Sequence, residues 1–344
     1  MSSIPRSVRL GFIGAGRRGR ELMAAARQAG AELAAASDIS EDALREAVNK
    51  FGVKAYRDVD GMLSGERLDA VVVSTPVRLH VAHVIKALDH GLDVLVEKPV
   101  TLSVSEANEL LRRVKASDRI VIVGFQNRYS EAVKVVKDSI GECNASMFAG
   151  YWYWTIPPIP WFRRRSETGG QVVEQVIHMF DIARYLVSDI DSVYAAYTEK
   201  GRDTDEDRGV GFENWASYSV AFRFSNGAVG SIHSTYALYP ELGKEIPLVS
   251  FDIVCREELI RFTGFNEAKI HVKGKDTQVI RASTDPTVNM FKSFIQAVLT
   301  RDKGLVPTAY EDAYWSNITV LAANESASIG SVIRIKDYAS GVGK

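Results

Sequence analysis

The chain has 344 residues, which is enough for two domains with cores of their own. Hydrophobic residues make up 46% of it and charged residues 25%, proportions that are ordinary for a soluble globular protein. The net charge is −1, and the sequence has no stripe of basic residues. These values argue against a protein that binds nucleic acid or an anionic membrane surface.

The cysteine content and the N-terminus bear on the cellular compartment. Cys143 and Cys255 are the only cysteines, too few in a chain of this length to predict a disulfide framework or a zinc site. The first six residues lack the apolar core of a secretion signal, and no apolar run reaches membrane-spanning length. We therefore expect a soluble protein of the reducing cytoplasm.

A glycine motif follows the first predicted strand. Residues 8–13 predict a buried strand, and the motif after it leads into a helix that ends near residue 28. The motif has glycines at Gly14, Gly16 and Gly19. Such a turn lets the backbone approach a pyrophosphate, which binds at the N-terminus of the following helix. The strand, turn and helix together predict a dinucleotide-binding site.

Asp38 ends the second predicted strand and lies 19 positions after Gly19. A carboxylate at this place accepts hydrogen bonds from the adenosine ribose and repels a 2′-phosphate, so it favours NAD over NADP. Arg17 and Arg18 leave NADP as the alternative cofactor, because either guanidinium can bind a phosphate. The alternative for Asp38 is a plain charge at a helix N-terminus.

Strands and helices go on alternating through the first 125 residues. Helices are predicted over 40–51, 79–90 and 103–117, and strands over 31–37, 70–74, 94–96 and 120–125. This order predicts a doubly wound parallel sheet with helices on both faces, a Rossmann-type α/β domain. Ser74, Thr75 and Pro76 follow one strand and either line the nicotinamide or form an ordinary turn. We assign His80 and His83 to helix packing or to the surface.

The strand over residues 94–96 runs directly into Glu97, Lys98 and Pro99. Pro99 ends the strand, because it has no amide hydrogen to donate and holds the preceding residue extended. An ammonium group at the end of a buried strand requires a partner or a role, since its removal from water is costly. Ligands of open α/β sheets bind at this edge, so Lys98 is our first candidate catalytic residue.

After residue 140 strands follow one another without intervening helices. They are predicted over residues 145–154, 192–197, 215–224, 228–236, 248–254, 259–262, 269–272 and 278–280. This order predicts a second, α+β domain built on a large, mostly antiparallel sheet. Asn226 and Gly227 predict a hairpin turn, and we expect the charged segment 202–212 to be a mobile loop.

Residues 169–187 predict one helix with a narrow polar stripe on an otherwise apolar surface. The stripe consists of Glu174, His178, Asp181 and Tyr185. It predicts the lining of an internal cleft, in which the Glu174 carboxylate orients the His178 imidazole as a general acid–base pair. A solvated stripe and a buried structural histidine are the alternatives. No cysteine or second histidine lies nearby, so we predict no metal site.

An aromatic run occupies residues 151–162. Alternate residues of a strand face opposite ways, so one set of these rings, with Trp154, can support the apolar face of a sugar. Trp161 would then close over it. The alternative is that the rings belong to the sheet core and to a subunit interface.

These motifs occur together and in one order, and Gly169-Gly170 precede the helix with Glu174 and His178. The chain thereby resembles the Gfo/Idh/MocA oxidoreductases, the glucose–fructose oxidoreductase and inositol dehydrogenase superfamily. The resemblance implies an NAD(P)-binding Rossmann domain over residues 1–126. It also implies a C-terminal α/β domain over residues 127–344, whose open sheet forms homodimers or homotetramers.

The resemblance also implies roles for individual residues. Lys98 corresponds to the catalytic lysine of the family and His178 to its histidine, and both would touch the substrate. Glu174 stands where many members have an aspartate. The glycine motif, Asp38, the turn over residues 74–76 and Glu97 would hold the cofactor. In the segment that links the domains, Asn127 would reach the cofactor and Arg128 the substrate.

The expected function follows from these roles. It is NAD(P)-dependent transfer of a hydride between the nicotinamide and a hydroxyl-bearing carbon of a sugar, cyclitol or sugar derivative. One alternative is an enzyme that oxidises a sugar transiently so that a glycosidic bond is eliminated. The other is a non-catalytic protein that senses NAD or sugars, since a fold does not fix a function.

Overall fold

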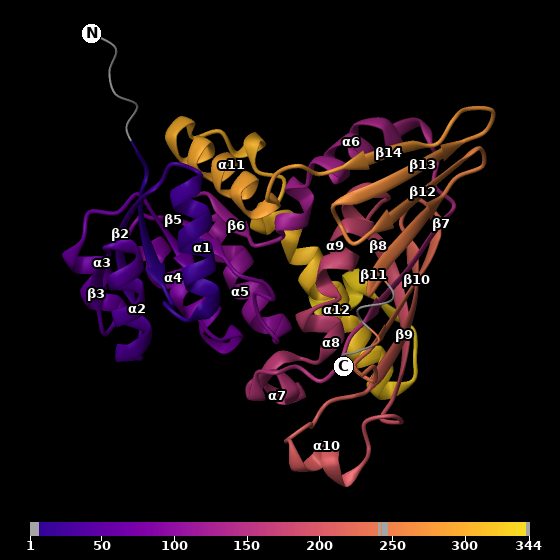
Figure 1. Cartoon of the computed structure of the whole chain (residues 1–344), viewed down its shortest axis with the longest axis horizontal. Coiled ribbons are helices and arrows are strands. Elements are labelled where there is room, and N and C mark those ends of the chain that lie inside the picture. Colours follow the sequence, from indigo (N-terminus) through magenta and orange to yellow (C-terminus); the bar gives the residue numbers. More distant parts are fainter. Residues whose placement is uncertain (1–6, 240–241, 243–246, 342–344) are drawn as a thin grey trace. The chain divides into compact units, whose positions relative to one another are not determined.

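The computed structural model describes residues 7–239, 242 and 247–341. The first six residues, on which our expectation about a secretion signal rests, lie outside this range. The chain divides into two compact units, and most of their elements are labelled in Figure 1. The first unit comprises Met1–Thr101, Ser105–Tyr129 and Thr284–Tyr314, and the second comprises the remaining segments. In the described part of the chain, no helix is long and apolar enough to cross a membrane.

The first unit is built on a sheet of six parallel strands in the order β3-β2-β1-β4-β5-β6. The strands are β1 (Arg9–Ile13), β2 (Glu32–Ser37), β3 (Lys54–Tyr56), β4 (Ala70–Val73), β5 (Asp93–Val96) and β6 (Val121–Val123). The helices between them are α1 (Arg17–Gln28), α2 (Glu41–Phe51), α3 (Val59–Gly65), α4 (His80–Asp89) and α5 (Val104–Lys115). The predicted doubly wound parallel sheet is confirmed.

Two elements of this unit were not predicted. The strand β3 has three residues, none of them buried, so it lacks the apolar run that identified the other strands. The helix α3 has only seven residues and two glycines. Its start is stabilised by Asp58, whose carboxylate accepts a hydrogen bond from the Gly61 amide at 2.6 Å.

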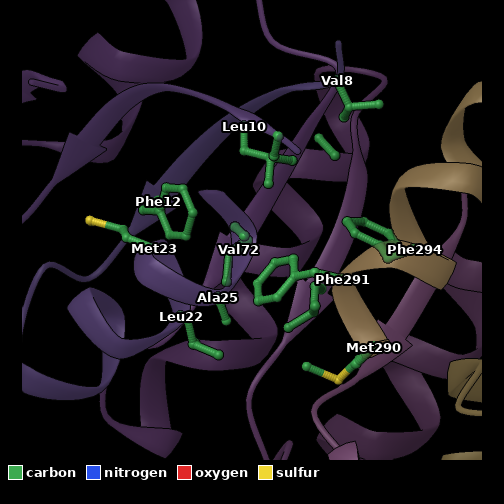
Figure 2. Packing of buried hydrophobic residues seen from close by; sticks show 14 of the residues in the cluster. Val8, Leu10, Phe12, Leu22, Met23, Ala25, Val72, Met290, Phe291 and Phe294 are labelled. Atoms are coloured by element: carbon green, nitrogen blue, oxygen red, sulfur yellow. The ribbon is translucent and has the colours of Figure 1, made fainter. Parts of the chain in front are cut away.

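A late segment of the chain completes the core of the first unit. The helix α11 (Pro286–Thr300) places Met290, Phe291 and Phe294, all fully buried, in one cluster with Leu10 and Val72 of the sheet (Figure 2). The sequence-based division had put this segment in the second domain. Apolar contacts between residues some 280 positions apart leave no local pattern, so the return of the chain could not be predicted.

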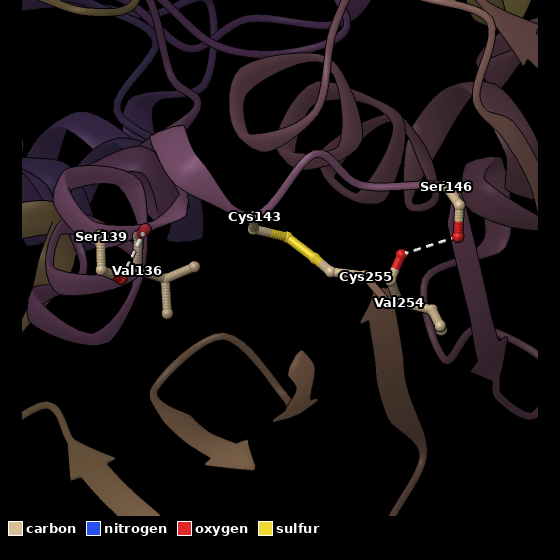
Figure 3. The surroundings of a disulfide bond; sticks show 6 residues. All are labelled: Val136, Ser139, Cys143, Ser146, Val254 and Cys255. Carbon is tan, nitrogen blue, oxygen red and sulfur yellow. Dashed lines mark hydrogen bonds between the residues drawn. A yellow bond between two sulfur atoms is a disulfide. The ribbon is translucent and has the colours of Figure 1, made fainter. Parts of the chain in front are cut away.

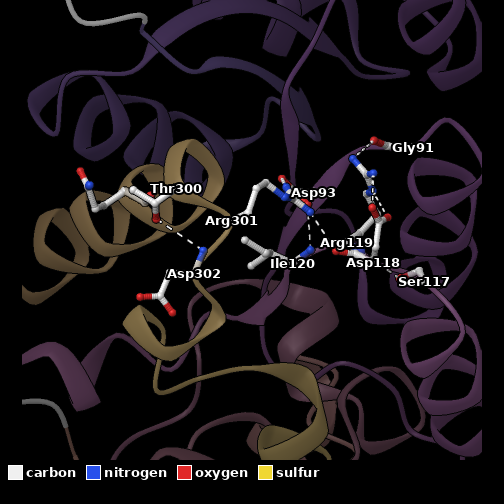
Figure 4. Close-up of polar contacts among 10 residues, drawn as sticks. Gly91, Asp93, Ser117, Asp118, Arg119, Ile120, Thr300, Arg301 and Asp302 are labelled. Atoms are coloured by element: carbon white, nitrogen blue, oxygen red, sulfur yellow. Dashed lines mark hydrogen bonds and ion pairs between the residues drawn. The ribbon is translucent and has the colours of Figure 1, made fainter.

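The segment that contains α11 also fixes the first residue of β5. Arg301, directly after α11, forms an ion pair with Asp93 and donates a hydrogen bond to the Asp118 carbonyl at 2.8 Å (Figure 4). The other Asp93 oxygen accepts from the Ile120 amide at 2.8 Å. Asp93 is only 2% exposed, so its charge is offset by these partners. The strand that leads to Lys98 is thereby fixed at its first residue.

The second unit contains a sheet of nine strands in the order β14-β13-β12-β11-β7-β10-β9-β8-β15. The strands are β7 (Met147–Tyr153), β8 (Ile190–Thr198), β9 (Ser217–Phe224), β10 (Val229–Thr235), β11 (Val249–Val254), β12 (Glu258–Thr263), β13 (Glu267–Val272), β14 (Gln278–Arg281) and β15 (Ile333–Arg334). Neighbours pair antiparallel except β10 with β7, which confirms the mostly antiparallel sheet. Buried and exposed residues alternate along β9, so one face of the sheet is covered and the other is open.

Helices complete the second unit. They are α6 (Glu131–Ser139), α7 (Arg165–Thr168), α8 (Gln171–Glu174), α9 (Ile177–Leu186), α10 (Asp205–Gly209), α12 (Tyr310–Ile329) and α13 (Ile335–Ser340), and the first residues of α12 belong to the first unit. The expected loop over 202–212 contains α10, because Thr204 and Asp207 form a capping box at its start. The predicted hairpin between β9 and β10 is confirmed, with Gly227 at φ +91°.

The two cysteines correct our expectation of no disulfide. Cys143 and Cys255 are bonded, with their Cα atoms 5.6 Å apart (Figure 3). They are 112 residues apart in sequence, but the pairing of Met147 with Val254 brings the start of β7 to the end of β11. The cysteines flank this pair of strands. Only the register of the sheet reveals their proximity.

Candidate active site

The glycine turn between β1 and α1 has the form that a dinucleotide requires. Gly14 has φ +103°, and a Cβ atom there would lie 2.8 Å from the Ser74 carbonyl oxygen. A Cβ atom on Gly19 would lie 2.1 Å from the Gly14 carbonyl oxygen. At Gly16, in contrast, a Cβ atom would meet no atom within 4 Å. Two glycines are therefore required by the protein itself, while the third leaves space beside the turn.

The N-terminus of α1 is open to an anion. Gly16 caps the helix and has no side chain to accept from its first amides, and the first turn has no acidic residue. The 12-residue helix therefore presents free N–H groups and the positive end of its dipole beside the space at Gly16. These residues fit the pyrophosphate of NAD, which when bound would supply the two-electron acceptor of an oxidation.

Asp38 lies beside this turn, directly after β2. One of its carboxylate oxygens accepts from the Ala15 amide at 2.7 Å and the other from the Ser40 amide at 2.8 Å. Each oxygen retains a lone pair, so the group can still accept from ribose hydroxyls. The carboxylate is thus held in place by the glycine turn and by the start of α2.

The two arginines of the glycine motif both pair with Glu21, but only Arg18 also pairs with Glu97. Arg17 is exposed and pairs with Glu21 at 2.7 Å, one helical turn away. Arg18 donates to the Glu97 carboxylate at 2.8 and 2.9 Å. Burial alone would lower the Arg18 pKa, but the charge of Glu97 and its hydrogen bond raise it above the ordinary value. Arg18 therefore connects the glycine turn to the end of β5.

The end of β5 carries Glu97, Lys98 and Pro99. Glu97 is 5% exposed, packs against Gly124, and accepts a hydrogen bond from the Lys98 amide at 3.2 Å. Lys98 is partly buried, and the bond between Lys98 and Pro99 is cis. The lysine therefore follows an acid that is already fixed by Arg18, and it stands at the carboxyl edge of the parallel sheet.

The turn after β4 lies at the same edge. The Ser74 hydroxyl donates to the Gly14 carbonyl at 3.1 Å, which connects this turn to the glycine motif. The Thr75 hydroxyl is 3.1 Å from the His83 ring, and its carbonyl oxygen is 2.7 Å from the His80 ring. Pro76 is exposed. The assignment of both histidines to packing or surface missed these contacts, which place them against a predicted cofactor residue.

The link after β6 is a short 3-10 turn, Gln126–Tyr129, in which Asn127 and Arg128 are buried. The Arg128 guanidinium donates to the Pro307 carbonyl at 2.8 Å and pairs with Asp312 at 2.6 Å. These contacts bind the return segment of the chain to the link. The predicted contact of Arg128 with substrate remains a prediction.

In the second unit, the predicted helix over residues 169–187 is interrupted. It consists of α8 and α9, because the Val176 amide bonds to the Gln171 carbonyl and the Met179 amide to the Val176 carbonyl. The prediction of one continuous helix is therefore wrong. Before α8, Gly170 has φ +86°, and a Cβ atom there would lie 2.4 Å from the Tyr218 hydroxyl.

The break changes the expected polar stripe. Glu174 ends α8 and is 6% exposed, and His178 lies in the first turn of α9 and is 7% exposed. Asp181 accepts a hydrogen bond at 2.7 Å from Ser316, which accepts one from Arg184. Tyr185 has the Lys137 ammonium 4.8 Å from its ring centre. Asp181 and Tyr185 therefore take part in structural contacts, while Glu174 and His178 remain the candidate acid–base residues.

The aromatic run gives His178 a neighbour. The Trp152 ring lies nearly parallel to the His178 imidazole, with centroids 6.3 Å apart, and its indole N–H has no hydrogen-bond partner among the described residues. Trp154 is partly buried just after β7, and Trp161 is exposed and contacts Phe162. Trp152 was therefore missed as a neighbour of the candidate residue His178. The alternation of the strand had placed it and Trp154 on one face, but not beside the histidine.

Comparisons with known proteins agree with this architecture. The Gfo/Idh/MocA model described as an oxidoreductase family with an NAD-binding Rossmann fold matches residues 8–125, and the model of the family's C-terminal domain matches residues 132–260. The levoglucosan dehydrogenase solved with NADH and levoglucosan superposes with a TM-score of 0.86 at 20% identity. The alignment covers 96% of this chain and 100% of that one.

Two relatives are similar in sequence. The myo-inositol 2-dehydrogenase of Thermotoga maritima is 30% identical over 220 residues, which are 60% of this chain and 62% of that protein. The 1,5-anhydro-D-fructose reductase of Ensifer adhaerens is 25% identical over 347 residues, 95% of this chain and 98% of that protein. The chain spans less than two thirds of the myo-inositol dehydrogenase. Both family models together cover most of the chain, and the protein therefore belongs to the Gfo/Idh/MocA oxidoreductase family.

Proposed function

We propose that the protein is an NAD-dependent dehydrogenase that acts on a CH–OH group of a sugar, cyclitol or related polyol. The observation that carries the proposal is the glycine turn, whose open space at Gly16 adjoins the uncapped N-terminus of α1. The relatives named above, which act on inositol and on anhydro sugars, support this substrate class.

The proposed roles of the residues follow from their chemistry. His178 removes the proton of the substrate hydroxyl, and Glu174 fixes the tautomer of the imidazole. Lys98 donates a hydrogen bond to the oxygen on which negative charge develops, which stabilises the transition state. Asp38 binds the ribose hydroxyls, and the charge it brings favours NAD over NADP.

We further propose that the chain acts as a homo-oligomer. The open face of the nine-stranded sheet supports this assembly, because it exposes the paired residues Met147 and Val229 and carries the stacked rings of Tyr151 and Tyr153. Exposed apolar and aromatic side chains of this kind are enriched at subunit interfaces. Sedimentation velocity of the purified chain tests the oligomeric state.

A substrate screen tests the proposed function. myo-Inositol, scyllo-inositol, levoglucosan and 1,5-anhydro-D-sorbitol are offered with NAD or NADP, and formation of the reduced nicotinamide is followed by absorbance. 1,5-Anhydro-D-fructose is offered with NADH or NADPH in the opposite direction. Turnover of at least one compound, faster with NAD than with NADP, is the expected result.

Hydrolysis of a glycoside without net nicotinamide reduction would indicate an eliminating enzyme instead. Binding of NAD without any turnover would indicate a sensing protein.

A further inference from the structure

One buried histidine of the first unit contacts two turns at the edge of the parallel sheet. His80 is the first residue of α4 and is 2% exposed. Its Nε2 atom lies 2.7 Å from the carbonyl oxygen of Thr75, in the turn after β4. Its Nδ1 atom lies 2.9 Å from the carbonyl oxygen of Pro99, in the turn after β5. A single ring therefore spans the two turns, and the second of them carries Lys98.

Both partners of His80 are carbonyl oxygens, which only accept hydrogen bonds. A neutral imidazole has one N–H and bonds one of them, whereas an imidazolium bonds both. Burial, the largest effect, lowers the His80 pKa, and the charge of Lys98 lowers it further, while the two carbonyls and Glu97 raise it. The net direction is downward, so the neutral ring dominates near neutral pH. At each moment, one of the two carbonyl groups is held.

These contacts are more than packing, because an apolar ring of the same size would give neither carbonyl group a donor, whereas the imidazole always gives one of them an N–H. The other ring of this helix that reaches the turn after β4 is His83, whose hydrogen-bond partner there is the Thr75 hydroxyl. The contact of His80 with Pro99 matters most here, because Pro99 directly follows Lys98 in the chain.

We propose that His80 is a positioning residue: it fixes the backbone of Lys98 and Pro99 against the turn after β4, and thereby sets where the lysine amine lies. This inference rests on the proposed role of Lys98 in the reaction. It assigns His80 no contact with the substrate. Loss of the His80 donor should therefore lower turnover through Lys98 and leave the binding of NAD largely intact.

Three substitutions at His80 separate a donor from a space-filling ring. The amide nitrogen of Asn replaces Nδ1 and points to Pro99, that of Gln replaces Nε2 and points to Thr75, and Leu has no donor. We expect H80L to lower kcat about tenfold or more, the effect of one buried hydrogen bond, and H80N or H80Q to restore part of it. NAD affinity, measured by fluorescence titration, should change little. The substrate is the compound of the screen that is turned over fastest.

His90→Leu is the matched control, because it removes an exposed histidine that contacts a carbonyl, that of Lys86, at the other end of the same helix. It should leave kcat unchanged. Thermal unfolding of each variant shows whether it is folded. If H80L does not fold, the comparison of H80Q with H80N carries the test, because only H80N keeps a donor toward Pro99. Wild-type turnover in H80Q, which has lost that donor, would overturn the proposal.

A double-mutant cycle with Lys98→Ala shows whether His80 acts through the lysine. If it does, H80L or H80Q lowers kcat in the wild-type background but by less than about twofold in the K98A background. Equal factors in both backgrounds would overturn the positioning role. Unchanged turnover in K98A alone would instead refute the role of Lys98, so the two failures are distinguishable.

Discussion

Glu97 is the residue through which the glycine turn and the lysine are connected. Its carboxylate accepts from Arg18 of α1 and from the Lys98 amide, and Gly124 leaves room for it on the side of β6. A buried acid without a cation would destabilise the edge of the sheet. The acid before the lysine therefore orders the backbone at the end of β5, next to Lys98.

Asp38 allows a test of the cofactor preference. Replacement by Asn keeps an oxygen that can accept from the Ala15 amide but removes the negative charge. We expect D38N to lower the ratio of kcat/KM for NAD to that for NADP by about tenfold to a hundredfold, the value of a charged hydrogen bond. Steady-state kinetics with both cofactors measures the ratio. An unchanged ratio would show that Asp38 does not select the cofactor.

For single residues, the sequence predicts those features that depend on neighbouring positions in the chain. The spacing of Gly14, Gly16 and Gly19, and the position of Asp38, follow from one strand, turn and helix. The partner of Arg18 lies 79 positions away, so the sequence left the arginine open as a phosphate ligand. The stacking of Trp152 on His178 depends in the same way on the register of a distant sheet.

Among the elements, the glycine turn before α1 makes the clearest prediction. Gly16→Ala adds a methyl group where no atom lies within 4 Å, at a φ of −61° that alanine adopts readily. We expect G16A to unfold at the wild-type temperature but to bind NAD much more weakly, because the methyl group enters the space assigned to the pyrophosphate. Calorimetric titration with NAD measures the affinity.

Gly19→Ala is the counterpart, because its methyl group would lie 2.1 Å from the Gly14 carbonyl oxygen. We expect G19A to lower the unfolding temperature as well as NAD affinity, since the turn itself must move. Wild-type NAD affinity in G16A would show that the cofactor does not bind at this turn.

We expect His83, in the helix α4, to make the stability of the protein depend on pH. Burial, followed by the charges of His80 and Lys86, lowers the His83 pKa from 6.5 to about 4. Between these values the unfolded chain binds a proton that the folded chain does not, so stability falls as the pH drops from 6.5 to about 4. Thermal unfolding from pH 7 to 5 should show a smaller decline for H83N than for wild type. The exposed His90 provides the control, and an equal decline in H83N would contradict the assignment.

The predictability of elements depends on their length and continuity. Long apolar strands and the hairpin at Asn226 and Gly227 were predicted, because their signals are local. The break between α8 and α9 was not, since the sequence there continues an apolar helical pattern without proline. The close approach of Tyr218 to Gly170, from β9, is one of the distant contacts that shape this segment.

In the whole molecule, residues that are far apart in the sequence are in contact, and no pattern in the sequence predicts these contacts. The return of residues 284–314 to the first unit adds Phe291 and Phe294 to its core. The disulfide joins Cys143 to Cys255 within the second unit. The alternation of strands and helices predicted both sheets, but it could not predict which later segment completes an earlier core.

The disulfide leads to a prediction about stability. It closes a loop of 112 residues, for which the chain-entropy model gives about 4–5 kcal/mol of stabilisation. We expect a reductant to lower the free energy of unfolding of the wild type and to have no effect on the C143S/C255S variant. Urea denaturation with and without reductant measures both. Two free thiols in the native, unreduced protein would contradict the pairing.

We propose that Lys98 and His178 carry out the chemistry while the glycine turn binds the cofactor. The most direct test measures kcat and NAD affinity of K98A and H178A, with the fastest compound of the substrate screen. We predict that each variant loses about a hundredfold or more in kcat, the usual contribution of an acid–base or charge-stabilising group, and binds NAD nearly as well as the wild type. Wild-type turnover in both variants would contradict the account.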